Sequence, residues 1–155
     1  MAEPVSRAVV EGFYKALASR DMQALASYLD EDVTWTMSGP IDVLPFCGRR
    51  SGKTNVLTVL DRDIPSLLGN RRLVPRTMLV DGDRAAVVGQ LLGSRRVDGH
   101  PISCRIAQFI RFRDEKVVDY ISIIDSFDAV EQVLGHPLER KAAPACVGDA
   151  GFVAV

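Results

Sequence analysis

The sequence predicts an α+β fold, with helices early in the chain and antiparallel strands late. Apolar residues recur at helical spacing before residue 30 and again from about 53 to 68. After Gly69 the apolar period becomes extended, and turn-forming residues separate four strands. This grouping is typical of folds in which one sheet packs a face against a set of helices.

The first segments are two helices and a strand. The apolar spacing predicts a helix over 6–19, and Asp21 can cap a second, short helix whose apolar face ends at Leu29. Residues 33–38, VTWTMS, alternate apolar and polar side chains. That alternation predicts a strand that is buried on one face.

A long connection and a third helix follow. Residues 39–52 contain two prolines and several glycines, so we expect a loop, and long loops in compact domains are often functional. The apolar stripe over 53–68 predicts the third helix. Pro65 is expected to kink that helix or to end its regular part, because proline lacks the N–H of the helical ladder.

The second half is predicted to be a meander that ends in a short helix. Asp81-Gly82-Asp83 is a strong hairpin signal between the first two strands, and Asp114-Glu115 is expected to form the tight turn between the last two. The four strands are expected over 73–80, 85–93 and the two halves of 103–125, and the helix over 127–134. Residues 136–155, rich in Ala, Pro and Gly, are expected to be a loosely ordered tail.

Composition excludes several classes of function. The chain has 155 residues, which is one domain by length, and its formal net charge of −1 gives no electrostatic case for nucleic acid or an anionic membrane. No apolar run is long enough to span a membrane, and the N-terminus has no signal-peptide pattern. Three widely separated cysteines suggest neither a disulfide framework nor a zinc site, so reduced thiols and a cytoplasmic location are expected.

Three stretches resemble the nuclear-transport-factor-two-like superfamily, and its SnoaL-like branch in particular. They are FYKALASRDMQALASYLDEDVTW (13–35), CGRRSGKTNVL (47–57) and QFIRFRDEKVVDYISIID (108–125). The resemblance implies a conical barrel over residues 1–135, with three N-terminal helices packed on a curved, mostly antiparallel sheet. It also implies an apolar pocket between sheet and helices, and a homodimer formed through the outer face of the sheet.

The resemblance and the strand period together assign residues to the pocket. Because alternate side chains of a strand share one face, the polar residues Gln108 and Ser122 are expected to point inward, while Arg105, Asp119 and Asp125 point outward or lie at the rim. The predicted ligand-binding residues are Phe13, Tyr14, Trp35, Met37, Phe46, Cys104, Gln108, Tyr120, Ser122 and Ile124. Trp35 and Met37 could equally be plain core, and Cys104 a small buried hydrophobe.

The positions of catalytic groups in ketosteroid isomerase-like members are implied by the same resemblance. The carboxylate base falls on Met37, the tyrosine on Phe13 and the neutral acid on Gln108. A thioether and a phenyl ring cannot take up a proton, so this mechanism is not expected.

The groups of epoxide hydrolase-like members are missing as well. Their tyrosine and asparagine positions fall on Trp35 and Met37, one aspartate position falls on Ser122, and residues 85–90 contain no ionisable side chain. Asp42 remains a weak candidate for acid–base catalysis, because its loop follows an inward strand and has apolar neighbours.

Our leading hypothesis is a SnoaL-like domain that binds a small hydrophobic molecule in an apolar, uncharged cavity, without cofactor or metal. The alternative is an isomerase, cyclase or hydrolase that acts on a polyketide, terpene or steroid-like substrate. A third possibility is an association module, which predicts no pocket and a dimer surface through Arg105, Phe109 and Ile121. Whether the protein is an enzyme is left open by the sequence.

Overall fold

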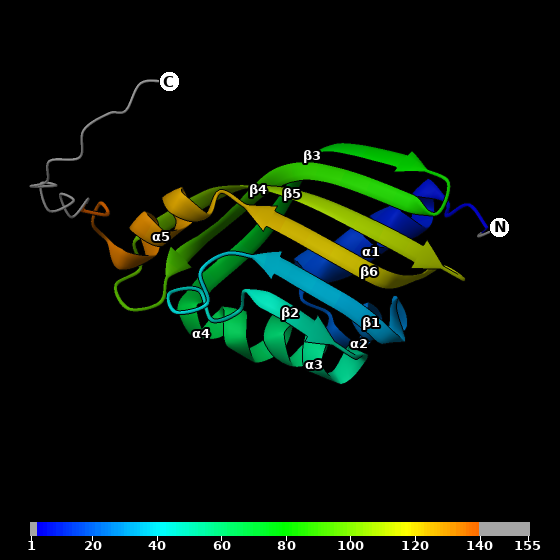
Figure 1. Cartoon of the computed structure of the whole chain (residues 1–155), viewed down its shortest axis with the longest axis horizontal. Helices are drawn as coiled ribbons and strands as arrows, with labels where there is room; N and C mark the ends of the chain where they lie inside the picture. The colour runs from blue at the N-terminus through cyan, green and yellow to red at the C-terminus, as the bar shows by residue number, and fades with distance from the viewer. Residues whose placement is uncertain (1–2, 140–155) are drawn as a thin grey trace, which may run out of the picture.

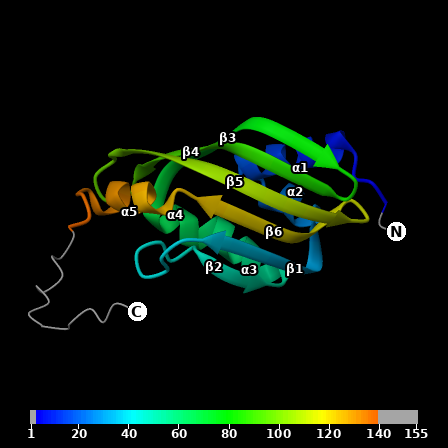
Figure 2. The same ribbon diagram turned by 45° about the horizontal axis from the view of Figure 1, so that its top comes forward.

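A computed structural model describes residues 3–139 of the chain (Figure 1). One sheet forms a curved layer, and helices pack against its concave face (Figures 1 and 2). The α+β class is therefore confirmed. Most of the predicted tail, residues 140–155, lies outside the described part of the chain.

The first two helices form where the caps predict them. In α1 (Arg7–Ser19), the hydroxyl of Ser6 accepts a hydrogen bond from the N–H of Val9. In α2 (Met22–Ser27), the carboxylate of Asp21 accepts one from Ala24. These side chains satisfy N–H groups that the first turn of a helix leaves free.

The sheet has six strands in the order β2-β1-β6-β5-β4-β3. All neighbouring pairs are antiparallel except β1 and β6, which run parallel. The strands are β1 (Leu29–Ser38), β2 (Gly48–Ser51), β3 (Leu68–Asp81), β4 (Arg84–Arg95), β5 (Pro101–Arg113) and β6 (Lys116–Ile124). The four consecutive antiparallel strands β3 to β6 are the predicted meander.

Two expectations about the sheet are corrected. The sheet is open, because β2 and β3 are its two edges and do not pair with each other, so the predicted barrel does not close. Strand β2 also lies inside the predicted loop, and it pairs with β1 from Thr34 to Met37. Its sequence, GRRS, has no apolar alternation and therefore gives no strand signal. Backbone hydrogen bonds to β1, and not a buried side-chain face, hold this strand in the sheet.

The predicted third helix is present but divided. It consists of α3 (Lys53–Thr58), a π-helical turn η1 (Val59–Asp63) and α4 (Ile64–Leu67). Pro65 stands in the first turn of α4, where its missing N–H costs little. The wider π turn lies directly before it, and it ends with a bond from the N–H of Ile64 to the carbonyl of Val59.

The core between the layers is built around Phe13, whose side chain is fully buried. Its ring meets five other aromatic rings in edge-on geometry, at centroid distances of 5.4 to 6.5 Å. Edge-to-face contacts of this kind add to the area buried by the rings. These partners are Tyr14, Tyr28, Trp35, Phe112 and Tyr120.

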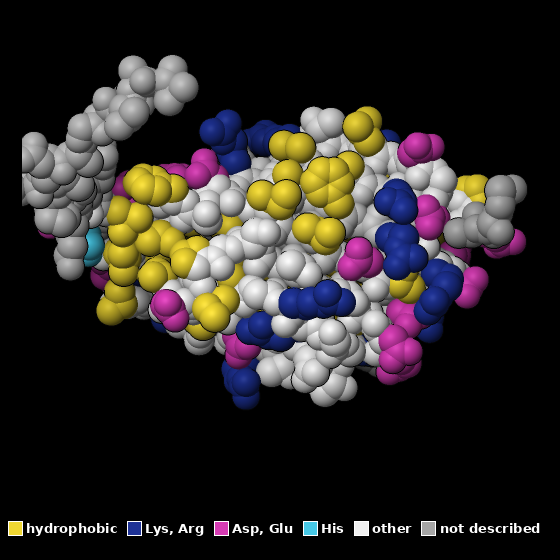
Figure 3. Space-filling view, viewed as in Figure 1, with side chains coloured by type: hydrophobic (Ala, Val, Ile, Leu, Met, Phe, Trp, Pro, Cys, Tyr) yellow, Lys and Arg dark blue, Asp and Glu magenta, His cyan; other side chains and the backbone are white. Residues whose placement is uncertain are grey.

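The outer face of the sheet carries exposed apolar side chains, which Figure 3 shows gathered over the strands. Phe109 of β5 and Val88 of β4 are each 52% exposed. The predicted alternation of β5 and β6 is confirmed, because Gln108 and Ser122 are buried while Arg105 and Asp125 are exposed. The other large apolar side chains exposed on the strands of the sheet are Leu79 on β3 and Ile121 and Ile123 on β6.

Candidate functional site

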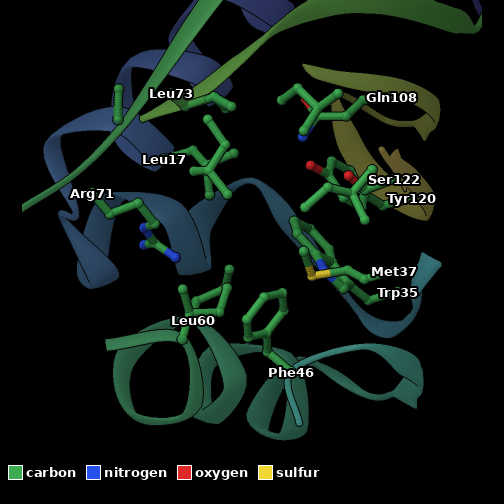
Figure 4. Close-up of a pocket in the computed structure, with 15 residues that line it drawn as sticks. Leu17, Trp35, Met37, Phe46, Leu60, Arg71, Leu73, Gln108, Tyr120 and Ser122 are labelled. Carbon is green, nitrogen blue, oxygen red and sulfur yellow. The ribbon is translucent and has the colours of Figure 1, made fainter. Parts of the chain in front are cut away.

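A cavity lies between the concave face of the sheet and the helices (Figure 4). Its free volume is about 50 Å³, which has room for a few water molecules. The exposed Ala18 is part of the lining, so the cavity reaches the surface beside the end of α1. The lining consists of Leu17, Ala18, Trp35, Met37, Phe46, Leu60, Ile64, Arg71, Leu73, Leu91, Ile106, Gln108, Tyr120, Ser122 and Ile124.

The sheet supplies the polar part of the lining. Gln108 on β5 stands directly opposite Ser122 on β6, and Tyr120 stands opposite Ile110 two pairs further along, on the same face of the sheet. Gln108 and Ser122 are the two buried polar residues among the described part of the chain, with 4% and 2% exposure. A buried amide and a buried hydroxyl need hydrogen-bond partners, so their position in a cavity wall favours a ligand-facing role.

Tyr14 fixes the orientation of the Gln108 side chain. Its hydroxyl donates a 2.6 Å hydrogen bond to Oε1 of Gln108. The amide nitrogen is then the donor that this side chain can offer to the cavity. Figure 4 shows this nitrogen on the cavity side of the amide, near Ser122.

An aromatic stack forms the adjoining part of the wall. The rings of Trp35 and Tyr120 lie 3.5 Å apart between centroids, with 10° between their planes. The indole Nε1 of Trp35 is buried without a hydrogen-bond partner among the described residues. Burial raises the pKa of the Tyr120 phenol well above its ordinary value, while the hydroxyl of Ser122 and the charge of Arg71 oppose the rise. Tyr120 is therefore a neutral donor at physiological pH.

Arg71 enters the cavity from β3, on the side opposite Tyr120 and Ser122 (Figure 4). The pairing of β3 with β4 shifts register between Gly69 and Arg72, and Asn70 inside this bulge has a left-handed φ of 48°. A bulge of this kind changes which face of the strand a side chain takes. As a result Arg71 and Leu73 line the cavity, while Arg72 is exposed.

The guanidinium of Arg71 has no counter-charge in the cavity. It makes no ion pair with a described carboxylate, and its Nη2 is buried without a hydrogen-bond partner among the described residues. Burial lowers the pKa of Arg71 from its ordinary value, the positive charge of Arg20 lowers it further, and Tyr120 opposes the change. Arginine nevertheless remains protonated at physiological pH. The predicted uncharged lining is thus wrong, because one cation stands in it.

The predicted site residues fall into three groups. Seven of them line the cavity: Trp35, Met37, Phe46, Gln108, Tyr120, Ser122 and Ile124. Phe13, Tyr14 and Cys104 are buried in the core behind the lining. Asp42 is exposed and is not part of the lining, so nothing supports the acid–base role predicted for it. That any of these residues binds a ligand remains a prediction.

Arg71 is the lining residue that the sequence alone does not reveal. Its segment, GNRRLVP, offers two adjacent arginines, and only the bulge decides which one turns inward. The apolar lining residues Leu60 and Ile64 were within the predicted helical stripe, so their helix face was identifiable but their place in a cavity was not.

The cavity holds donors and apolar surface, and it lacks metal ligands and bases. Its lining contains no Asp, Glu or His. Within residues 3–139 no group of three or more His, Cys, Asp or Glu side chains is arranged to hold a metal ion. Chemically, the arrangement can bind an apolar body and donate hydrogen bonds to oxygen acceptors on it.

The curved sheet, the packed helices and the cavity between them define a protein of the cone-shaped, ketosteroid isomerase-like fold class. The SnoaL-like domain family matches residues 10–120, and the chain belongs to that family. Both conclusions confirm the resemblance drawn from the sequence.

Solved structures of similar proteins agree. A protein described as "Putative Isomerase from Rhodopseudomonas palustris" is 32% identical, with a TM-score of 0.72 over 82% of this chain and 93% of that one. An NTF2-like protein of unknown function from Burkholderia pseudomallei is 22% identical, with a TM-score of 0.74 over 81% and 94%. TerC, co-crystallised with polyporic acid, is 23% identical, with a TM-score of 0.73 over 81% and 95%. The latter two likenesses show the fold alone.

Comparison with curated proteins gives no significant match. In the described residues, no helix is both long and apolar enough to cross a membrane.

Proposed function

We propose that the protein binds a small hydrophobic molecule in the cavity between sheet and helices. The observation that carries the proposal is the lining itself: apolar side chains surround a small set of polar groups contributed by neighbouring strands. Because the free space of about 50 Å³ holds only a few waters, a larger ligand requires lining side chains to move. Co-crystallisation of TerC with polyporic acid is consistent with ligand binding by this fold.

Trp35 makes this proposal directly measurable. It is the single tryptophan of the chain and it lines the cavity. A panel of hydrophobic compounds is expected to change Trp35 fluorescence and to raise the melting temperature, because a ligand that binds the native state stabilises it. Failure of every compound to change either signal at millimolar concentration would count against the proposal.

A matched pair of variants locates the binding. Leu73→Phe adds volume to a residue of the lining, whereas Leu138→Phe makes the same change at an exposed position outside it. The first variant is expected to weaken binding at least several-fold and the second to leave it unchanged. Equal effects of the two changes would place the compounds elsewhere on the protein.

An isomerase, cyclase or hydrolase that acts on a polyketide, terpene or steroid-like substrate is the second candidate. The similarity to a protein described as a "Putative Isomerase" favours it, and so do the donors Gln108 and Arg71, which could stabilise an oxyanion. The absence of Asp, Glu and His from the lining counts against proton abstraction. Incubation of a bound ketone in D₂O tests the isomerase: deuterium uptake at its α-carbon above the rate without protein supports the isomerase reading, and no excess uptake speaks against it.

We also propose that the protein is a homodimer joined through the outer face of the sheet, and that it resides in the cytoplasm. The exposed apolar side chains of Phe109 and Ile121 support the dimer. The unpaired thiols of Cys47 and Cys104 support a reducing compartment. Light scattering after size-exclusion chromatography is expected to give twice the chain mass of 16.9 kDa, and Phe109→Glu to give the monomer mass.

A further inference from the structure

Three of the five polar side chains of the lining, Gln108, Trp35 and Arg71, offer hydrogen-bond donors to the cavity, while the hydroxyls of Tyr120 and Ser122 can donate or accept. Because Tyr14 occupies the amide oxygen of Gln108, Nε2 is the group that this amide can offer to a ligand. The indole of Trp35 can only donate, and so can the guanidinium of Arg71. Both of these carry a buried nitrogen without a partner among the described residues.

The charge of the cavity lining, like its donors, favours a ligand that carries oxygen acceptors. Arg71 is the single ionised side chain of the lining, which contains no carboxylate. No carboxylate contributes to the shift of its pKa, and the charged side chain that does contribute is the cation Arg20, which lowers it. Arg71 is half-buried with one guanidinium nitrogen buried and unpartnered, and a cation withdrawn from water in this way is costly unless something pairs with it.

Geometry places these groups around one space. Gln108 and Ser122 are neighbours on the adjacent strands β5 and β6 on one side, and Arg71 enters from the other side (Figure 4). A molecule that lies between them contacts the donors of the sheet at one end and the guanidinium at the other. Apolar side chains such as Leu60 and Phe46 surround the space between the two ends.

We propose that the ligand is a hydrophobic molecule with an anionic oxygen group, a carboxylate or an enolate, which pairs with Arg71. This inference rests on the proposed binding function and specifies its ligand class. The guanidinium presents a planar fork of N–H donors that matches two oxygens of such a group. The donors at Gln108 and Trp35 select further oxygen acceptors on the same molecule, and a ligand rich in N–H groups would leave them unpaired.

The test compares each acid with its neutral amide of nearly the same shape. Benzoate, cinnamate and 2-naphthoate are titrated against benzamide, cinnamide and 2-naphthamide, with Trp35 fluorescence and melting temperature as readouts. The wild-type protein is expected to bind the acids roughly 10- to 100-fold more tightly than the amides, the size of a charge-assisted hydrogen bond made in a buried site.

Three variants assign the preference to one side chain. Arg71→Gln is expected to bring the ratio of acid to amide affinity close to one while amide affinity changes little. Arg71→Lys keeps the charge but loses the fork, so part of the preference is expected to remain. Arg72→Gln removes the same charge from the adjacent, exposed position and is expected to leave the ratio unchanged.

The outcomes separate this inference from the proposed function. Equal binding of acids and amides by the wild-type protein would overturn the anionic ligand and leave hydrophobic binding intact. A preference that survives in Arg71→Gln, or is lost equally in Arg72→Gln, would overturn the role of Arg71. If neither acids nor amides bind, both the inference and the binding function fail.

Discussion

The hydroxyl of Tyr14 on α1 donates a 2.6 Å hydrogen bond to the amide oxygen of Gln108 on β5, and both residues are buried. The bond joins the first helix to the centre of the sheet. It also determines which end of the amide faces the cavity, so one contact serves both stability and the proposed ligand site.

Tyr14→Phe is expected to destabilise the protein by about 1–3 kcal/mol, because it leaves a buried amide oxygen without its donor. Chemical denaturation measures the loss. Tyr28→Phe is the control, since Tyr28 is half-buried and its hydroxyl makes no hydrogen bond to another described residue. If the two variants are equally stable, the Tyr14 hydroxyl contributes nothing specific.

A double-mutant cycle isolates the pair. Gln108→Leu is expected to be destabilising by itself, because it leaves the Tyr14 hydroxyl buried and unpaired. Combining it with Tyr14→Phe removes both polar partners. The loss of unfolding free energy in the double variant is therefore expected to be smaller than the sum of the two single losses, by about 1 kcal/mol or more. Strict additivity of the three unfolding free energies would show that the two groups do not interact.

Alkaline pH is expected to weaken the fold through its buried tyrosines. Burial raises the pKa of Tyr14, and the nearby Tyr120 raises it further, from the ordinary value of 10.0. Above pH 10 the unfolded chain then loses a proton that the folded chain retains, so the free energy of unfolding falls as pH rises. The difference in stability between the wild-type protein and Tyr14→Phe should accordingly shrink from pH 9 to pH 11. A difference that stays constant over this range would contradict the raised pKa.

The two buried cysteines are expected to react slowly. Burial raises the pKa of the Cys47 and Cys104 thiols from 9.0 to about 11. The charge of Arg50 opposes the rise at Cys47, whereas the charges of Asp128 and Asp125 add to it at Cys104. At pH 8 their thiolate fraction is then about a hundredfold below that of an ordinary thiol, and the thiolate is the reactive form.

A disulfide reagent such as Ellman's measures this reactivity. Cys146 lies outside the described residues, so a Cys146→Ser variant limits the count to the two buried thiols. Slow labelling of the native variant and rapid labelling in denaturant are expected. Labelling at the same rate in both states would show that the thiols are accessible.

Gly89 is expected to tolerate no side chain. A Cβ at this position in β4 would lie 2.5 Å from the carbonyl oxygen of Val74 on β3, which is backbone and cannot rotate away. Gly89→Ala is therefore expected to cost about 1–3 kcal/mol through overpacking. Gly69→Ala is the control, because its nearest contact, at 3.1 Å, is the mobile hydroxyl of Ser94. A Gly89→Ala variant as stable as Gly69→Ala would mean that β3 moves aside without cost.

The sequence predicted the elements whose stability is local. The helix over 6–19 and its neighbour were identifiable because Ser6 and Asp21 cap them with their own side chains. The meander was identifiable because Asp81-Gly82-Asp83 and Asp114-Glu115 mark its turns and its strands alternate. This alternation also placed Gln108 and Ser122 on the buried face.

Features that depend on pairing between distant segments were not identifiable. Strand β2 has no apolar alternation and exists because β1 offers it a free edge. The barrel expected from the resemblance stays open because β2 and β3 are not brought together. Neither feature has a local signature, since backbone hydrogen bonds are the same for every sequence.

By itself, the sequence determined the fold class, the family resemblance and the polar face of the sheet, because side-chain period and capping act over a few residues. The tertiary structure alone decided the chemistry of the cavity. A register shift between β3 and β4 turns Arg71 inward and leaves Arg72 in solvent, and a hydrogen bond from Tyr14 directs the amide of Gln108. Both depend on contacts between residues far apart in the chain, and together they turn a cavity that was expected to be uncharged into one with a cation and an excess of donors.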